Sequence, residues 1–182
     1  DGTTESDALA QSAYLYIGQS QLRLGESKSA AMAFQKAASM DFDKTVKETA
    51  FYNYAVSQAK GATTPFGSSI ALFEQFLNDY PQSKYTSDVE GYLVDAYMAT
   101  SDYAKALASI GRIKKPSDKV LKAKQNVLYN LGVQALQKGN RKQAAEFLTR
   151  AIKVGNYDPK ILNESRLWLA QTQYDSGDYN TT

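Results

Sequence analysis

Hydrophobic residues recur every three or four positions through most of this chain. Tyr14, Ile17 and Leu24 lie on one such series, and a second series runs through residues 128–136. Because side chains three and four residues apart lie on the same face of an α-helix, this spacing indicates amphipathic helices. Only four Pro interrupt the pattern. It predicts helices over residues 7–24, 27–39, 45–60, 67–79, 84–100, 103–113, 117–138, 141–153 and 160–176.

The predicted helices form similar pairs. Gly18 precedes Ala30 by twelve residues in the first pair, and Gly132 precedes Ala144 by the same distance in the fourth, with a glycine in the turn between them each time. A single helix hairpin cannot bury its apolar face alone, so repeated pairs indicate a stacked array. Weaker copies complete a series of anchor positions at intervals of 37 to 39 residues, namely Gly18, Ala55, Val94, Gly132 and Ala170.

At these residues the chain resembles the tetratricopeptide repeat family, over about residues 11–182. The resemblance implies an all-α fold, in which antiparallel helix pairs stack into a right-handed superhelix of about 4.5 repeats. Small residues such as Gly18 and Gly132 should let the two helices of a pair approach closely. Both ends look like those of a segment cut from a longer protein. The whole chain 1–182 is then one array, with units of about 11–47, 48–86, 87–124, 125–162 and an incomplete 163–182.

One segment carries a narrower resemblance. A predicted helix ends in the motif Phe76-Leu-x-x-Tyr80-Pro81-x-Ser83-x-Tyr85. This motif is similar to the repeat variant of bacterial envelope proteins, such as the lipoprotein of the outer-membrane barrel-assembly machine and the periplasmic accessory protein of the Tol–Pal system. It implies a location in the bacterial periplasm or at the outer membrane, with the cytoplasm as the alternative.

Composition restricts the chemistry of the chain. The sequence contains neither Cys nor His, which removes the thiolate nucleophile, Cys-based metal sites and the commonest general base. Carboxylate pairs such as Asp41 with Asp43 supply too few ligands for a calcium loop. We therefore expect no enzyme, and no catalytic, cofactor-binding or metal-binding residues. No run of about 18 apolar residues exists, so we expect no membrane span, and any lipid anchor would lie outside the segment.

Charge is distributed unevenly along the chain. Residues 105–166 contain 14 Lys and Arg against four Asp and Glu, whereas the whole chain has a net charge of +2. The densest basic stretch runs from Arg112 to Lys124 and could bind phosphate, anionic lipid or an acidic partner. We interpret it as a solvated loop and helix start. No glycine-rich loop or interleaved aromatic residues accompany it, so we expect no nucleic-acid partner.

The family resemblance also implies where a partner would bind. In the family, the first helix of each pair lines a concave groove. Here that face carries Tyr, aliphatic and amide side chains with few charges, which suits an extended peptide or a partner helix. Tyr52 and Tyr129 are the anchor candidates, because large amphipathic rings dominate binding hot spots. The predicted groove residues are Leu15, Gln19, Leu22, Arg23, Tyr52, Val56, Lys60, Asp95, Met98, Tyr129, Val133, Leu136, Gln137, Gln171 and Tyr174.

Other aromatic and apolar residues should serve packing. Tyr14, Tyr54, Tyr97 and Trp168 are expected to lie between helices, as the repeat requires. The incomplete last unit, which includes Leu167, lacks a partner helix for its apolar side. We expect this unit to fray or to pair with another copy of the chain.

These observations predict a non-catalytic scaffold that binds a protein or an extended peptide, as an interaction scaffold or a machine subunit of the bacterial envelope. The alternative is a recruiting or regulatory repeat array, attached to an enzyme or signalling domain outside this segment. A signal peptide or lipidation motif in the full-length protein would favour the first, and an appended enzyme domain the second.

Overall fold

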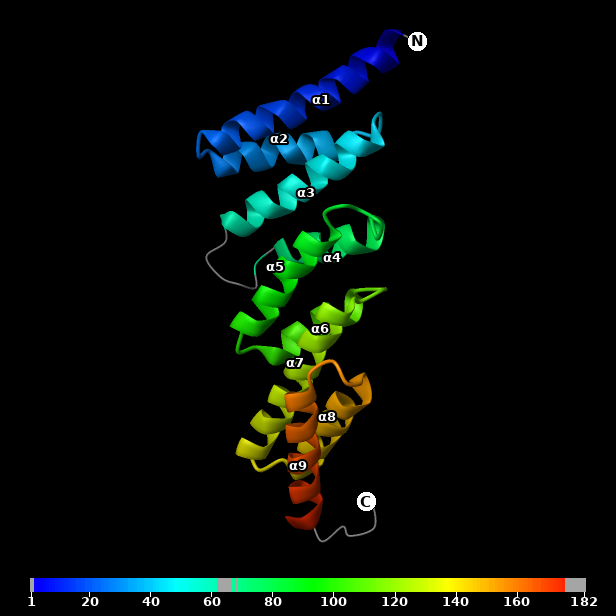
Figure 1. The fold of residues 1–182 in the computed structure, drawn as a ribbon. Helices are drawn as coiled ribbons and strands as arrows, with labels where there is room; N and C mark the ends of the chain where they lie inside the picture. Colours follow the sequence, from blue (N-terminus) through cyan, green and yellow to red (C-terminus); the bar gives the residue numbers. More distant parts are fainter. Residues whose placement is uncertain (1, 62–66, 68, 176–182) are drawn as a thin grey trace. The chain divides into compact units, whose positions relative to one another are not determined.

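The structure, a computed structural model, describes residues 2–61, 67 and 69–175. This part of the chain is helical (Figure 1). The all-α prediction is confirmed, and the helix ends agree with the prediction within two residues, except that α1 begins earlier, at Gly2. Outside the described residues lie residues 1 and 68, the segment 62–66 that follows the helix predicted over 45–60, and residues 176–182 of the incomplete last unit. The helices are α1 (Gly2–Arg23), α2 (Ser27–Ser39), α3 (Lys44–Lys60), α4 (Ser69–Asp79), α5 (Thr86–Ala99), α6 (Tyr103–Arg112), α7 (Asp118–Gln137), α8 (Arg141–Val154) and α9 (Pro159–Asp175).

Local sequence signals explain where these helices begin and end. Asp43, Asp102 and Asn140 precede α3, α6 and α8, and each side-chain oxygen accepts a backbone N–H of the first turn. After α1 and α7 the chain turns at Gly25 and Gly139, whose φ angles of 81° and 73° lie in the left-handed region that favours glycine. These turns bring α2 back along α1, and α8 back along α7.

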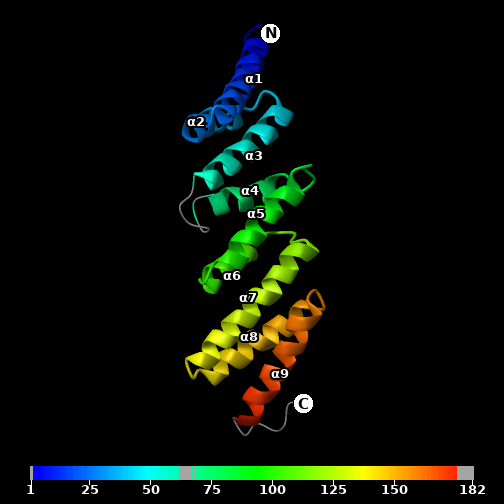
Figure 2. The same ribbon diagram turned by 60° about the vertical axis from the view of Figure 1, so that its left-hand side comes forward.

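Two compact units divide the chain, Asp1–Leu93 and Val94–Thr182, with the division inside α5. In the first unit α2 packs against both α1 and α3, and in the second unit α8 packs against both α7 and α9 (Figures 1 and 2). Within each unit, successive antiparallel helices therefore stack as a helical repeat requires. The single array of 1–182 with its unit boundaries stays a prediction.

Gly18 and Gly132 lie at close helix crossings. A Cβ atom built on Gly18 would lie 2.6 Å from Cδ1 of Phe34, and one built on Gly132 would lie 2.8 Å from Cγ of Leu148. Phe34 and Leu148 are fully buried, so neither side chain has open space to move into. The predicted need for glycine at both crossings is confirmed.

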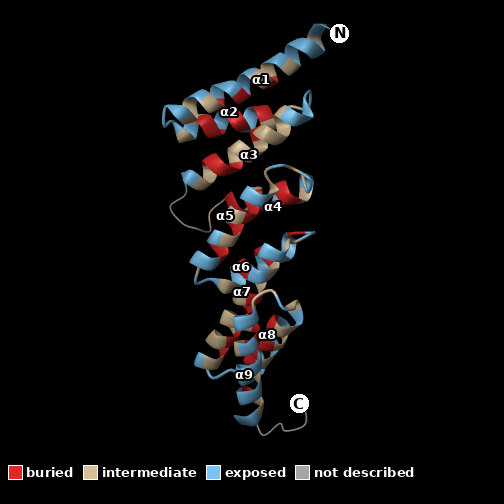
Figure 3. Cartoon of the chain, viewed as in Figure 1, coloured by how far each residue is buried: buried red, intermediate tan, exposed pale blue. Residues whose placement is uncertain are grey.

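The buried residues follow the helix interfaces, as the red segments of Figure 3 show. In the first unit Leu15, Ala30, Phe34, Ala37 and Ala50 form one cluster that joins α1, α2 and α3. Small alanines let the helices approach, and the Phe ring fills the space between them. The same division between small and large residues recurs between α7 and α8.

The expectation that four aromatic residues pack between helices is confirmed only in part. Tyr97 is fully buried, and its hydroxyl lies 2.8 Å from that of Ser109. Tyr54 is half-buried. Tyr14 and Trp168, in contrast, expose 36% and 43% of their surface. Both still lie at helix interfaces without being buried, since Tyr14 lines a hollow with Met32 and Ala33 of α2, and Trp168 lines one with Leu136 of α7.

Candidate functional site

The predicted groove residues are not equally accessible. Leu15 and Val56 are only 7% and 6% exposed, so a partner cannot reach them, and their assignment to the groove is corrected. Leu15 belongs to the core because the first helices of successive pairs, α1 and α3, contact each other. The exposed members are Arg23, Lys60, Asp95, Met98, Gln137, Gln171 and Tyr174, and the half-buried members are Gln19, Leu22, Tyr52, Tyr129, Val133 and Leu136.

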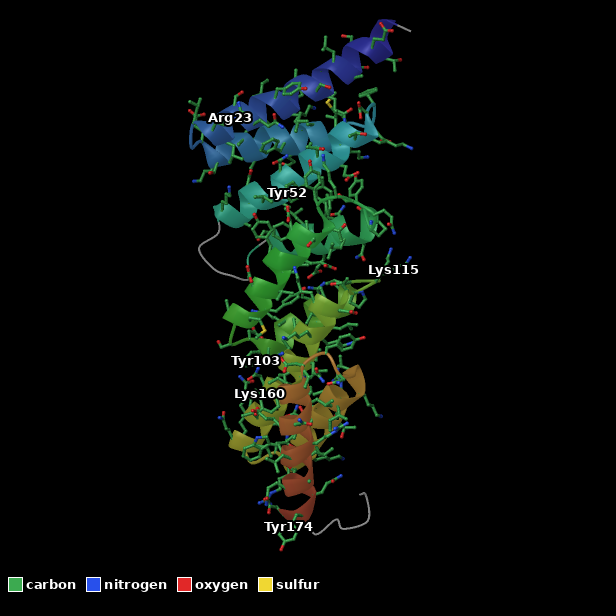
Figure 4. The ribbon with its side chains drawn as sticks, in the orientation of Figure 1. Arg23, Tyr52, Tyr103, Lys115, Lys160 and Tyr174 are labelled. Carbon is green, nitrogen blue, oxygen red and sulfur yellow. The ribbon has the colours of Figure 1, made fainter. Side chains whose placement is uncertain are left out.

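Tyr52, one of the two anchor candidates, is labelled in Figure 4 and belongs to an aromatic cluster of the first unit. Its ring stacks on Tyr85, with 4.1 Å between centroids and 8° between planes, and it meets Phe76 edge-on at 6.2 Å. Burial in this environment raises the pKa of Tyr52 to about 12. The ring therefore serves packing more than partner contact. The other members of this aromatic cluster are Phe51 and Tyr80.

The same cluster explains the motif that begins in the last turn of α4. Phe76, Tyr80 and Tyr85 of the motif supply three of its five rings. The hydroxyl of Ser83 donates to the carboxylate of Glu48 in α3, and in turn accepts the backbone N–H of Tyr85 at 3.1 Å. The motif thus fastens the segment after α4 onto α3, so its residues carry a packing role in this chain.

A hollow of about 480 Å³ lies at the surface between α7 and α9 of the second unit. Leu136 of α7 and Trp168 of α9 give it apolar walls, and Gln171 adds a side-chain amide. Two of these residues, Leu136 and Gln171, belong to the predicted groove. Arg141 and Asp175 also line it, and Nε2 of Gln171 donates to the Asp175 carboxylate at 2.8 Å. We call this site the α7–α9 hollow.

Tyr129, the second anchor candidate, lies beside the α7–α9 hollow. Its pKa is raised, first by burial and then by a hydrogen bond with the carboxylate of Glu164, while the Trp168 indole also hydrogen-bonds to its hydroxyl. Tyr129 and Leu136 are seven residues apart on α7, which places them on one helix face. The structure therefore brings Tyr129, Leu136 and Gln171 together around Trp168, a residue expected to pack between helices.

A second hollow, of about 510 Å³, lies in the first unit and was missed by the sequence analysis. Phe51, Tyr54 and Leu72 form its apolar part, on α3 and α4. Lys47 at its polar edge already forms an ion pair, since its Nζ lies 3.0 Å from the Asp41 carboxylate. The hollow involves the second helices of pairs, α2 and α4, whereas the prediction considered only first helices. Apolar Leu72 on an otherwise solvent-facing side of α4 is the signal that could have indicated it.

The basic stretch forms the α6–α7 loop and the first turns of α7. Lys115 and Lys119 are exposed, and Lys122 lies 3.7 Å from the Asp158 carboxylate. The hydroxyl of Ser117 caps α7 by accepting the N–H of Val120. This arrangement matches a solvated loop and helix start.

Neither a metal site nor a membrane-spanning helix occurs among the described residues. No group of three or more acidic side chains in that part of the chain could hold a metal ion. None of the helices described there combines the length and the hydropathy needed to cross a membrane.

Comparisons with known proteins support the repeat resemblance at the first helix pair. Residues 12–39, which cover the second half of α1 and all of α2, match the family model of the tetratricopeptide repeat. Two solved structures of MamA mutants are similar to this chain. One has 19% identity, a TM-score of 0.40, and coverage of 95% of this chain and 91% of that chain. The other has 18% identity, a TM-score of 0.38, and coverage of 94% and 85%. No curated protein matches the sequence significantly.

Proposed function

We propose that this chain is a non-catalytic scaffold that binds a segment of another protein at the α7–α9 hollow. The observation that supports the proposal is the meeting of Leu136, Trp168 and Gln171 around one concave surface of about 480 Å³. Binding sites for peptides combine such apolar walls with a few polar groups that fix orientation. The tetratricopeptide repeat match at the first pair agrees with a role in protein binding.

The lining of the hollow indicates the chemistry of the bound segment. Trp168 and Leu136 suit an aliphatic or aromatic side chain inserted between α7 and α9. Gln171 can both donate and accept hydrogen bonds, which an extended peptide backbone requires of its binding site. Arg141 and Asp175 bring one charge of each sign. We therefore expect a peptide with an apolar anchor and little net charge.

A peptide selection tests this proposal. Peptides that bind the whole chain would be selected from a random displayed library. Calorimetry would then measure the Kd of each selected peptide for the parent and for the variants. Trp168→Ala removes an anchor wall, which at a hot spot costs about 2 kcal/mol, or about 30-fold in Kd. The control Lys115→Gln with Lys119→Gln should leave Kd almost unchanged at physiological salt. Peptides that bind Trp168→Ala as well as the parent, but lose affinity for the Lys control, would contradict the hollow and favour the basic stretch.

We also propose that the protein acts in the bacterial envelope. The support is the similarity of the motif around Tyr80 and Ser83 to the repeats of envelope proteins. Fractionation of cells that make the native full-length protein tests this location, with a periplasmic and a cytoplasmic marker as controls. Recovery with the cytoplasmic marker would contradict it.

A further inference from the structure

The outer side of α1 carries an exposed apolar stripe. It consists of Leu9, Tyr16, Ile17 and Leu24, and we call it the α1 stripe. Leu9 and Leu24, near its two ends, are 73% and 75% exposed. Leu9, Tyr16 and Ile17 are seven or eight residues apart, which places them on one side of the helix, and Leu24 follows directly after its last residue. Leu9 and Tyr16 lie on the side opposite the buried Gln11 and Leu15, whereas Ile17 lies nearer to Met32 and Ala33 of α2. Figure 3 colours most of α1 pale blue, as exposed. Neighbouring exposed apolar side chains of this kind are typical of an interaction site.

A second exposed stripe lies on α9. It consists of Leu167, Ala170 and Tyr174, and we call it the α9 stripe. Leu167 and Tyr174 are 69% and 67% exposed and lie seven residues apart, again on one helix face. Figure 4 shows Tyr174 projecting from the end of the helix. The stripe faces away from the buried Leu162 and Thr172, and Trp168 of the α7–α9 hollow lies beside it.

Charges at the ends of the two helices are complementary. Glu5 lies in the first turn of α1, and Arg23 in its last turn. On α9 the order is reversed, with Lys160 near the start and Asp175 at the end. When α1 and α9 lie parallel, Glu5 is near Lys160 and Arg23 is near Asp175. An antiparallel arrangement would bring like charges together at both ends, which is unfavourable.

The net charges of the two units distinguish the pairing of α1 with α9 from the pairing of identical helices. Residues 1–93 contain seven Lys and Arg against 11 Asp and Glu, a net charge of −4. Residues 94–182 contain 14 against eight, a net charge of +6. Contact between two α1 helices would join two negative units, and contact between two α9 helices would join two positive ones. Contact between α1 and α9 of different copies joins opposite charges.

We infer that the α1 stripe of one copy packs in parallel along the α9 stripe of a second copy. The contact is heterologous, since it uses different surfaces on the two copies and leaves one stripe of each kind free. Asp175 belongs to both the contact and the α7–α9 hollow, but Leu167 and Tyr174 do not line the hollow, so substitutions at these two residues test the contact independently of the proposed function.

Mixing of two variants tests the contact. The α1 variant carries Leu9→Gln and Tyr16→Gln, and the α9 variant carries Leu167→Gln and Tyr174→Gln. Sedimentation velocity should show the parent forming dimers and larger species as concentration rises. Each variant alone should remain monomeric, because each retains only one stripe. A mixture should form a dimer that does not grow, since the intact α9 stripe of one variant meets the intact α1 stripe of the other.

Other outcomes would overturn the inference. Circular dichroism must show parental helicity in both variants, which is expected because all four side chains are exposed. A parent that stays monomeric at every concentration excludes the contact. Dimers of the α1 variant alone would indicate pairing between two α9 helices, and dimers of the α9 variant alone would indicate pairing between two α1 helices.

The parallel orientation has a test of its own. Glu5→Lys should weaken association by about two- to five-fold, which is the range of an exposed ion pair. Lys160→Glu should weaken it similarly, and a chain carrying both substitutions should recover the parental affinity. If the double variant is as weak as the two single effects combined, Glu5 does not face Lys160, and the parallel alignment is wrong.

Discussion

Gln125 of α7 and Gln11 of α1 make matching hydrogen bonds in the two units. Both are fully buried, and each lies seven residues before the glycine of its helix crossing. Nε2 of Gln125 donates to the carbonyl oxygens of Ala151 and Gly155 at 3.1 and 2.6 Å. Its Oε1 accepts the backbone N–H of Asp158 at 2.8 Å. One side chain therefore joins the end of α8 to the residue that precedes α9.

Gln11 repeats this arrangement at the other helix pair. Its Nε2 donates to the carbonyl oxygens of Ala37 and Met40 at 3.1 and 2.9 Å, and its Oε1 accepts the N–H of Asp43 at 2.8 Å. The last carbonyls of a helix have no partner within the helix, so these bonds satisfy groups that would otherwise be buried and unpaired. The glutamines thus set where the next helix begins.

We expect Gln125→Ala to lower the free energy of unfolding by about 2–4 kcal/mol, since three hydrogen bonds are lost and buried backbone groups remain unsatisfied. Chemical denaturation followed by circular dichroism measures the change. Gln137→Ala on the same helix is the control, because Gln137 is exposed, and it should change stability little. Equal stability of the two variants would show that water replaces the buried amide without cost.

Gly132→Leu should overpack the crossing between α7 and α8 and cost about 1–3 kcal/mol of stability. The physical reason is the contact of 2.8 Å that even a Cβ atom would make with Leu148. Gly111→Leu in α6 is the matched control, because nothing lies within 4 Å of a Cβ there. Leu is the better helix former, so the control should be neutral or slightly stabilising. A Gly132→Leu protein that melts like the parent would show that the crossing can open.

The sequence predicted the helices and their crossings well, because both depend on residues close in the chain. The twelve-residue interval from Gly132 to Ala144 fixes which small residues face each other across a hairpin. The partners of Gln125 could not be predicted in this way, since they lie 26 to 33 residues away in the chain. A signal did exist: a polar Gln occupies the same place, seven residues before the glycine, in both of the clearer repeats.

The candidate site was predicted less well than the fold. Residue type and helix face identified Leu136 and Gln171, which do line one hollow. Tyr52 was assigned to the groove by the same reasoning, but its ring packs against Phe76 and Tyr85 and is half-buried. A helix face read from sequence does not show whether a later segment, here the one after α4, folds over it.

Stability should fall as the pH rises from about 10 towards about 12, partly because of Tyr52. Its pKa in the folded protein is raised to about 12, above the value of 10.0 for an ordinary tyrosine. The folded state therefore keeps the phenol proton over a range in which the unfolded state loses it. Stabilisation by this group is complete below pH 10 and decreases as the pH rises through the folded pKa. Denaturation curves at several pH values measure the decrease.

Tyr52→Phe removes the ionisable hydroxyl and should make this alkaline loss of stability smaller. Tyr16→Phe is the control, because Tyr16 is exposed on the outer side of α1, and its curve should follow the parent. An unchanged pH dependence in Tyr52→Phe would show that other tyrosines account for the loss, among them Tyr80 and Tyr129, whose pKa values are also raised by burial.

Substitutions at Tyr52 and at Trp168 should have opposite effects on stability and on peptide binding. Tyr52→Ala removes the ring stacked on Tyr85, and we expect a loss of about 2–4 kcal/mol, below the range for a fully buried ring because Tyr52 is only half-buried. Trp168→Ala should cost much less stability, because Trp168 is 43% exposed. It should nevertheless weaken the binding of a selected peptide about 30-fold. Thermal melts and calorimetry on the same samples measure both properties.

The conservative variant Tyr52→Phe keeps the stacked ring and loses only a long hydrogen bond of 3.4 Å to Asp88, so it should retain both stability and peptide affinity. Affinity for Tyr52→Ala is measured well below its melting temperature, where the chain is still folded, and should equal that of the parent. If folded Tyr52→Ala loses the peptide while Trp168→Ala keeps it, the partner binds at the first unit. The aromatic cluster would then be the site, and the α7–α9 hollow would not.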